Sequence, residues 1–201
     1  MRKHPGRSLV ALPLDYVVVD LETTGLSSTY AEIIEMAALR VRDGEIVESF
    51  QQLVRPWRGI PPGITELTGI TNGMVEDAPP LEEVLGTYMD FIGGDILLGH
   101  NVSFDIRFLY DRTSYLGIAF SNDFVNTVRI ARKAVPGLPG YRLEDLCRRI
   151  GIESKDITFH RALADCVQTH RLYLRLRECF ESEEALQACF SRKRSPRPSS
   201  Q

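Results

Sequence analysis

Two acidic residues, Asp20 and Glu22, follow the apolar run at residues 16–19. A run of β-branched and aromatic residues predicts a buried strand, in which side chains two positions apart point to the same face. Asp20 and Glu22 therefore share one face with Val18. Two neighbouring carboxylates repel each other and resist burial, so they require a compensating cation, and a divalent metal is the simplest candidate.

Two later aspartates and a histidine are weak signals when each is taken alone. Asp105 lies near the start of an expected helix, where the helix dipole by itself favours an acid. Asp165 lies at the border of the apolar arc of another expected helix. His160 precedes Asp165 by five residues, which is a poor same-face spacing on a helix. Both can reach one centre only if His160 lies on the loop that enters the helix.

The other histidines suit structural roles. His100 lies between a short strand and a helix, where backbone hydrogen bonds are the expected use of its ring. His170 is on a core-facing helix position, and His4 is in an expected tail. None of the three is a predicted catalytic group.

The elements that must position these residues follow from the apolar pattern. Expected strands cover residues 16–22, 31–41, 45–54, 96–98 and 124–125, and expected helices cover 80–92, 103–116, 143–150 and 161–178. Arg42-Asp43-Gly44 predicts a tight turn between two of the strands, since glycine accepts positive φ. The predicted fold is α/β: a mixed sheet that starts with an antiparallel meander and is flanked by helices.

Length and composition favour one intracellular domain. The chain has 201 residues, 43% of them apolar, which is enough for a single core. No apolar run approaches the roughly 20 residues of a membrane span, and no secretory signal follows the basic start. A cytoplasmic location is expected. The four cysteines form no Cys-x-x-Cys pair, so reduced thiols are favoured over a zinc site or a disulfide.

The charge is distributed unevenly along the chain. Seven of the 24 Lys and Arg residues lie in residues 1–8 and 191–201, where there is no acid, so the body holds 17 basic against 27 acidic residues. The expected organisation is a basic tail at 1–10, a domain at 11–190 and a disordered basic Ser/Pro-rich tail at 191–201. The second tail is either a nucleic-acid tether or a solvated end. An acidic body attracts nucleic acid only through bound metals and local basic groups.

Three motifs in order resemble the DEDDh 3′–5′ exonucleases. They are Asp20-Leu-Glu-Thr-Thr-Gly, His100-Asn-Val-Ser-Phe-Asp and His160-Arg-Ala-Leu-Ala-Asp, and the segments 64–71 and 135–146 between them match as well. Within that family the chain is most similar to proofreading exonucleases, namely the epsilon subunit of DNA polymerase III and the exonuclease domain of PolC-type polymerases. The resemblance covers residues 14–177. Asn126 departs from the Asp of many relatives, but that position is not a metal ligand.

The resemblance implies a ribonuclease-H-like fold and a set of roles. Asp20, Glu22, Asp105 and Asp165 would hold two Mg²⁺ or Mn²⁺ ions, and His160 would be the general base. The turn after Glu22 would hold the terminal nucleotide; it comprises Thr23, Thr24, Gly25 and Leu26. Phe104 either lines the substrate groove or packs in the core. Hard oxygen ligands suit these ions, which assist phosphodiester hydrolysis as a pair about 4 Å apart.

The implied activity is removal of 5′-mononucleotides from the single-stranded or frayed 3′ end of DNA, in proofreading or repair. An exoribonuclease or oligoribonuclease with the same site is the alternative, so RNA stays open as a substrate. A non-catalytic polymerase-associated subunit that binds nucleic acid is a third reading, although binding alone needs no inward carboxylates. Proofreading by a chain of this length would require a separate DNA polymerase. No membrane partner is expected.

Overall fold

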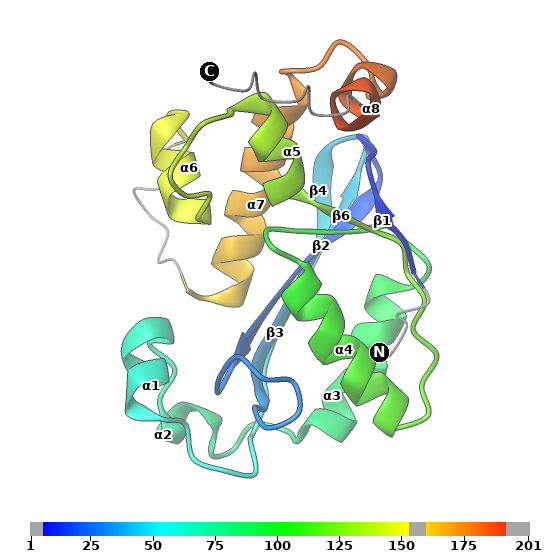
Figure 1. Ribbon diagram of the computed structural model, residues 1–201. Helices are drawn as coiled ribbons and strands as arrows, with labels where there is room; N and C mark the ends of the chain where they lie inside the picture. Colours follow the sequence, from blue (N-terminus) through cyan, green and yellow to red (C-terminus); the bar gives the residue numbers. More distant parts are fainter. Residues whose placement is uncertain (1–5, 153–159, 192–201) are drawn as a thin grey trace, which may run out of the picture.

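A six-stranded mixed sheet forms the centre of the protein, shown in Figure 1 as a computed structural model that describes residues 6–152 and 160–191. The strand order is β1-β6-β5-β2-β3-β4. β2, β3 and β4 are antiparallel, whereas β5, β6 and β1 join in parallel. The strands are β1 Ser8–Leu9, β2 Tyr16–Thr23, β3 Ile33–Arg42, β4 Glu45–Leu53, β5 Leu97–Gly99 and β6 Phe124–Asn126. The predicted meander and mixed sheet are confirmed.

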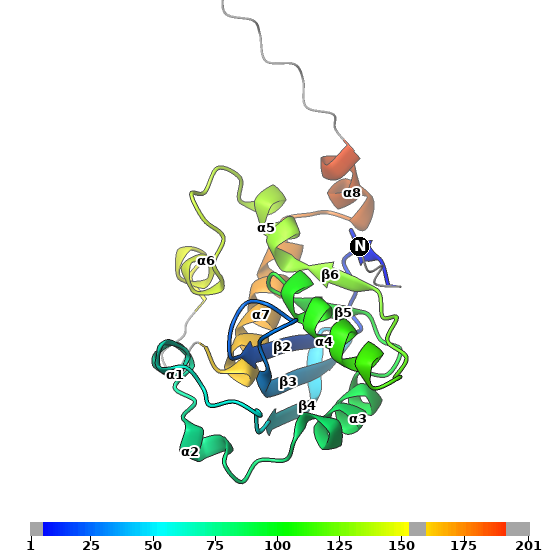
Figure 2. The same cartoon turned by 60° about the horizontal axis from the view of Figure 1, so that its bottom comes forward.

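Helices cover both faces of the sheet, as Figure 2 shows. α3 (Leu81–Ile92) and α4 (Ser103–Tyr115) pack on the face of β2 that carries Val17, Val19 and Leu21. The face that carries Val18 is covered by α5 (Thr127–Ala134), α6 (Leu143–Arg149), α7 (Ala162–Arg177) and α8 (Glu183–Ser191). The alternation predicted for β2 is therefore correct. It directs Asp20 and Glu22 toward the α7 side.

Two short helices, α1 (Pro62–Thr68) and α2 (Asn72–Val75), close one end of the sheet through a small cluster around Ile34, Ile60 and Ile70. The sequence pattern did not predict them, nor α5, α8 and β1. α2 has four residues and β1 has two, which are too few to show a period, and α1 begins with a proline and a glycine. Their positions are set by tertiary contacts.

The ends of the domain differ from the expected boundaries. Ser8 and Leu9, predicted within a tail at 1–10, form β1 and pair with Phe124 and Val125 of β6. Ser191, predicted as the first residue of the second tail, is the last residue of α8. Residues 192–201 lie outside the described residues. The sheet and helices thus include residues that composition alone assigned to tails.

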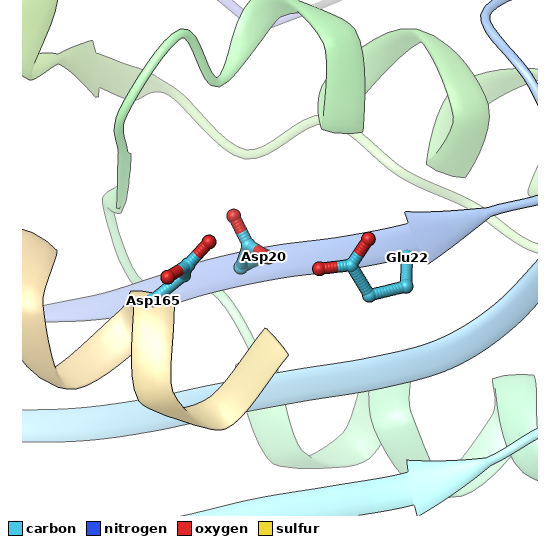
Figure 3. Close-up of side chains that lie close together, drawn as sticks. All are labelled: Asp20, Glu22 and Asp165. Atoms are coloured by element: carbon cyan, nitrogen blue, oxygen red, sulfur yellow. The ribbon is translucent and has the colours of Figure 1, made fainter. Parts of the chain in front are cut away.

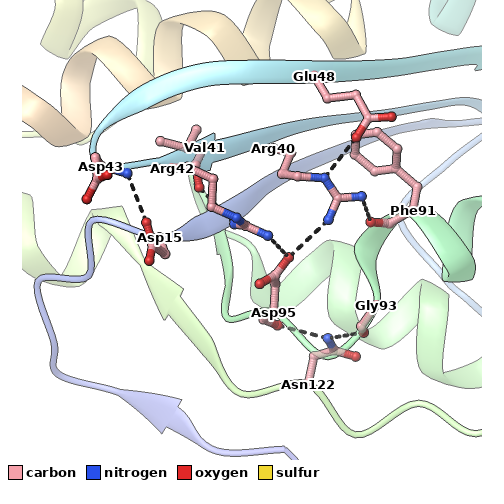
Figure 4. Close-up of polar contacts among 10 residues, drawn as sticks. All are labelled: Asp15, Arg40, Val41, Arg42, Asp43, Glu48, Phe91, Gly93, Asp95 and Asn122. Carbon is pink, nitrogen blue, oxygen red and sulfur yellow. Dashed lines mark hydrogen bonds and ion pairs between the residues drawn. The ribbon is translucent and has the colours of Figure 1, made fainter.

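The β3–β4 hairpin is anchored by the polar network in Figure 4. Asp43 and Gly44 have φ values of 50° and 79°, as the predicted turn requires. Arg40 and Arg42 both reach Asp95 Oδ2, at 3.3 and 2.7 Å, and Arg40 also contacts Glu48 at 2.9 Å. These bonds hold the turn before β5 against β3. These contacts thereby fix β5, the strand that leads into α4.

The helix lengths and the cysteines can be compared with the sequence-based expectations. Across residues 6–152 and 160–191, none of the helices has the length and apolar content that crossing a bilayer requires. The four cysteines are free thiols, and Cys147 and Cys166 are buried. These two thiols, on α6 and α7, belong to the apolar cluster on the α7 side of the sheet.

Candidate active site

Three carboxylates from two distant segments meet on the α7 side of the sheet. Asp20 and Glu22 extend from β2, and Asp165 extends from the first turn of α7 toward them (Figure 3). One oxygen of each residue lies within 4.8 Å of the others. They meet because α7 packs across β2 and β3 with its N-terminal end beside the end of β2. The arrangement brings three oxygen donors within the span of one small cation.

Asp105 reaches β2 along the strand edge that β5 leaves unpaired. β5 pairs with Val17 and Val18 and ends at Gly99, so β2 continues beyond its neighbour. The N–H of Leu21 donates to Asp105 Oδ1 at 3.0 Å, and Asp105 is buried at the start of α4. Asp105 thus replaces a strand partner and lies beside the residue between Asp20 and Glu22. Asp105 is outside the group of three close oxygens, but its charge helps to raise the pKa of Asp20.

All four carboxyl groups are shifted toward the protonated form. Burial is the largest cause in each case: it raises the pKa of Asp20 well above its usual range and that of Glu22 to about 8. Burial likewise raises the pKa of Asp105 to about 7 and that of Asp165 to about 6. For Asp20 and Glu22 the neighbouring carboxylates add to the effect. A bound divalent cation would remove this repulsion.

The donor set fits a hard divalent ion. Asp165 Oδ1 is buried and has no hydrogen-bond partner among the described residues, so a polar atom is aimed into the cluster without compensation. Carboxylate oxygens suit Mg²⁺ and Mn²⁺, and the cluster of Asp20, Glu22 and Asp165 includes no thiol or imidazole ligand. These residues can hold such an ion, and Asp105 lies close enough to share its field.

The raised pKa values predict how stability depends on pH in chelator-treated protein. The folded state keeps protons on Glu22 and Asp165 above the pH at which the unfolded chain, with values of 4.5 and 3.8, loses them. The stability that these two groups contribute is then full below about pH 4 and is lost as pH rises toward 8. We expect the melting temperature in EDTA to fall between pH 5 and 8, and to fall less in Mg²⁺. Thermal melts of wild type and Glu22→Gln test this, because the variant should show a shallower slope; equal slopes would contradict it.

His160 lies just before α7, as expected for a residue on the loop that enters this helix. It precedes α7, has a left-handed φ of 63°, and is exposed at the rim of the acidic cluster. Its backbone N–H is directed at Asp165 Oδ2 over 3.4 Å. The residues before it, 153–159, lie outside the described residues. His160 therefore enters from a loop next to Asp165, and its catalytic role stays a prediction.

The other two described histidines have structural partners. His100 is held by Thr127 Oγ1 at 2.8 Å and by the Tyr141 carbonyl at 2.7 Å, and burial lowers its pKa. His170 Nδ1 lies 2.9 Å from the Tyr16 hydroxyl within the core. The structural roles predicted for His100 and His170 are correct.

The turn expected to hold the terminal nucleotide follows β2 directly. Thr23 is buried and its hydroxyl donates to the Gly25 carbonyl at 2.8 Å, whereas Leu26 is 83% exposed. Thr24 exchanges hydrogen bonds with Glu32. Phe104, for which two roles were open, is half-buried against the core and lies 4.8 Å from Phe108 between ring centroids. The turn is rigid and close to Glu22, which is compatible with the predicted role.

Sequence reasoning missed one residue beside the cluster, Glu35. It lies opposite Glu22 on β3 and is fully buried. Its carboxylate accepts hydrogen bonds from the Arg161 guanidinium at 2.8 and 3.2 Å, from Ala162 N at 2.9 Å and from Gln51 at 2.8 Å. Burial would raise the pKa of Glu35, but these donors together lower it. The bonds attach the first residues of α7 to the sheet. The sequence signal that could have identified Glu35 was an acid within an otherwise apolar strand.

Gly99 is a second residue whose importance only the structure reveals. A Cβ atom there would lie 2.7 Å from Val102 Cγ2 and 3.0 Å from the Val19 carbonyl oxygen. Gly99→Ala must displace the turn that begins α4 and with it Asp105. We expect a loss of about 1–3 kcal/mol in unfolding free energy, together with weaker binding of Mn²⁺ by the acidic cluster. Urea unfolding compares it with Gly63→Ala, where the new Cβ meets nothing within 4 Å; equal stability of the two variants would contradict this.

Comparison with known sequences identifies a family and close relatives. Residues 17–173 match the family model RNase_T, described as an exonuclease family. The chain is 41% identical over 164 residues to the DNA polymerase III subunit epsilon of Aquifex aeolicus, covering 81% of this chain and 80% of that one. It is 40% identical over 164 residues to the PolC-type DNA polymerase III of Bacillus subtilis, covering 80% of this chain. It spans only 11% of that polymerase.

Solved structures share the architecture. Exonuclease X, solved with 5′ overhanging duplex DNA, superposes with a TM-score of 0.68 at 29% identity, covering 87% of this chain and 99% of that one. The nuclease domain of 3′hExo, a DEDDh family member bound to rAMP, gives a TM-score of 0.69 at 23% identity, covering 82% and 92%. The second likeness shows the shared fold, which is the predicted ribonuclease-H-like one.

Proposed function

Since this chain belongs to the exonuclease family, we propose that it hydrolyses phosphodiester bonds from the 3′ end of DNA and releases 5′-mononucleotides. The convergence of Asp20, Glu22 and Asp165 with buried Asp105 beside them carries the proposal. We assign the catalytic domain to residues 11–190, preceded at its edge by β1.

The acidic cluster is suited to a reaction that builds negative charge. Asp20, Glu22, Asp105 and Asp165 would hold two Mg²⁺ or Mn²⁺ ions, which when bound would neutralise the phosphate and lower the pKa of the attacking water. Asp20 and Glu22 are fixed by the β2 backbone, Asp105 by its bond from Leu21, and Asp165 by the helix that Glu35 anchors. The protein thus orients its ligands before substrate arrives.

His160 is assigned as the general base. Its position at the exposed rim next to Asp165 would let an imidazole accept a proton from water and pass it to solvent. Thr23, Thr24, Gly25 and Leu26 would hold the terminal nucleotide beside Glu22, and Phe104 would border the same groove. The position of His160 beside Asp165, and of the turn directly after Glu22, supports the first two roles.

His160→Ala should slow hydrolysis by roughly 10²- to 10⁴-fold, because the proton acceptor is lost while the carboxylates stay in place. The melting temperature and its increase on adding Mn²⁺ should stay close to wild type. Single-turnover rates and thermal melts measure the two effects. His4→Ala, outside the predicted site, serves as the control. A variant that retained the wild-type rate would remove His160 from the mechanism.

Product analysis tests polarity and substrate class. Single-stranded and mismatched duplex DNA, with 3′ or 5′ labels, is incubated with protein and Mg²⁺ or Mn²⁺, alongside matched RNA. We expect 3′-labelled DNA to release its label as a mononucleotide at once, and 5′-labelled DNA to shorten one nucleotide at a time. Preference for RNA would favour the exoribonuclease alternative, and no cleavage of any substrate would favour the non-catalytic reading.

We propose proofreading or repair in association with a separate DNA polymerase in the cytoplasm. Support comes from the names of the relatives: one is a polymerase subunit, and the other is a polymerase of which this chain matches a small part. Co-purification of the tagged chain with a polymerase would test the association.

A further inference from the structure

A shallow hollow opens beside the turn that follows Glu22. It has a volume of about 280 Å³, and its lining begins with Thr24, Gly25 and Leu26 and continues to Tyr30 and Arg58. The predicted terminal-nucleotide turn therefore forms one wall of a larger surface. The opposite wall comes from the segment after β4, which no motif assigned to the substrate.

Large apolar side chains are exposed around this hollow. Among the described residues, four such side chains are more than three-quarters exposed: Leu26 (83%) and Tyr30 (78%) line this hollow, and Trp57 (88%) and Tyr115 (83%) line the adjoining one. Trp57 directly precedes Arg58 and lines the adjoining hollow, which shares Glu32 with the first. Exposed rings in one place indicate a binding surface, since isolated apolar exposure needs no explanation but a cluster does.

The backbone that carries these rings is held rigidly. Glu32 accepts hydrogen bonds from Trp57 N at 2.7 Å and from Arg58 N at 3.0 Å. The same residue exchanges backbone and side-chain bonds with Thr24. Arg112 of α4 adds a bond of 2.6 Å to the Ala31 carbonyl. The rings and the nucleotide turn therefore keep a fixed relation to each other, which lowers the entropic cost of binding.

The charge of the hollow is suited to a phosphate. The Arg58 side chain is exposed, and the described residues provide it with no hydrogen-bond or ion-pair partner. The only acid in the lining is Glu32, whose two oxygens are already engaged by backbone N–H groups. A guanidinium that has no partner among the described residues and that lines the same hollow as an exposed ring is suited to a single strand, with bases stacked on the rings and phosphate on the cation.

We propose that Tyr30, Trp57 and Arg58 form a second binding site, which holds the nucleotides immediately 5′ of the one being removed. The proposal rests on the proposed exonuclease function. Tyr30 and Trp57 provide stacking platforms, and Arg58 contacts the connecting phosphate. The site draws a single strand across the exposed side of the turn, so that its 3′ end reaches Glu22 and Asp20.

The test separates this site from the acidic cluster by substrate length. The p-nitrophenyl ester of thymidine 5′-monophosphate carries a terminal nucleotide and no preceding one, whereas oligothymidylates of two, three and six residues carry both. All are assayed with the full chain and Mn²⁺. We expect Tyr30→Ala and Trp57→Ala to raise KM for the six-residue substrate by roughly 5- to 100-fold, the loss of one stacked base, with the ester unaffected. Tyr30→Phe should restore binding because it keeps the ring.

Arg58→Ala should raise KM for the oligonucleotide and reduce the salt dependence of binding by about one counterion. Val47→Ala and Arg175→Ala, at exposed positions on β4 and α7, serve as matched controls. Wild-type KM for the oligonucleotide in the Tyr30, Trp57 and Arg58 variants would overturn the proposal, as would equal losses on oligonucleotide and ester. If the wild-type protein hydrolysed neither substrate, the result would instead overturn the proposed exonuclease function on which the second site rests.

Discussion

Asp20→Asn should reduce exonuclease activity by at least about 10³-fold, the size expected when a group that stabilises transition-state charge is lost. Asp20 is buried, and the charges of Asp105, Asp165 and Glu22 add to burial in raising its pKa. Replacing one carboxylate oxygen by an amide nitrogen removes a ligand and places a donor where a cation should bind. Release of nucleotides from labelled single-stranded DNA under Mn²⁺ measures the loss.

The stability of the same variant distinguishes loss of chemistry from loss of folding. Asp20 lies among buried like charges, so Asp20→Asn should melt at or above the wild-type temperature in EDTA. It should also lose most of the increase that Mn²⁺ gives the wild type. Asp90→Asn, an exposed change on α3, is the matched control and should behave as wild type. An Asp20→Asn protein that digested DNA at the wild-type rate would refute the metal site.

Glu35→Gln should impair both the fold and the reaction, although Glu35 is a positioning residue. The amide keeps the shape but cannot satisfy Arg161, Ala162 and Gln51 together, since its nitrogen only donates. We expect the unfolding free energy to fall by about 1–3 kcal/mol. The loss is smaller than for a fully buried ion pair, because Arg161 can turn partly to solvent. Activity should fall by roughly 10- to 100-fold through displacement of Asp165, as for groups that orient metal ligands.

The readout that a purely stabilising role would not change is metal affinity. Mn²⁺ titration of Glu35→Gln, at a temperature where it is folded, should show weaker binding than wild type. Glu48→Gln is the control, because its ion pair with Arg40 is half-exposed and should be worth within about 1 kcal/mol. Wild-type Mn²⁺ affinity and rate in the Glu35 variant would show that α7 does not depend on this anchor.

Regular elements with a clear period were predictable from the sequence. β2 alternates between two packed faces, and residues 81–92, 103–115 and 162–177 carry enough turns to reveal a helix, so these elements agree with the prediction. α2 is too short to show a period, α1 begins with a proline and a glycine, and β1 pairs with the edge that β6 offers it. Elements that owe their existence to neighbours leave no local pattern.

Strand periodicity was enough to put Asp20 and Glu22 on one face, and three motifs in order along the chain indicated the other site residues, because periodicity and motif spacing are local. It could not place Asp165 against β2, or give Asp105 its bond to Leu21, since these depend on where β5 ends and how α7 crosses the sheet. Nor could it show that Glu35 anchors α7, or that Tyr30 and Trp57 lie on adjoining hollows that meet at Glu32. Burial and convergence depend on contacts between segments far apart in the chain, so they appear once the helices have packed on the sheet.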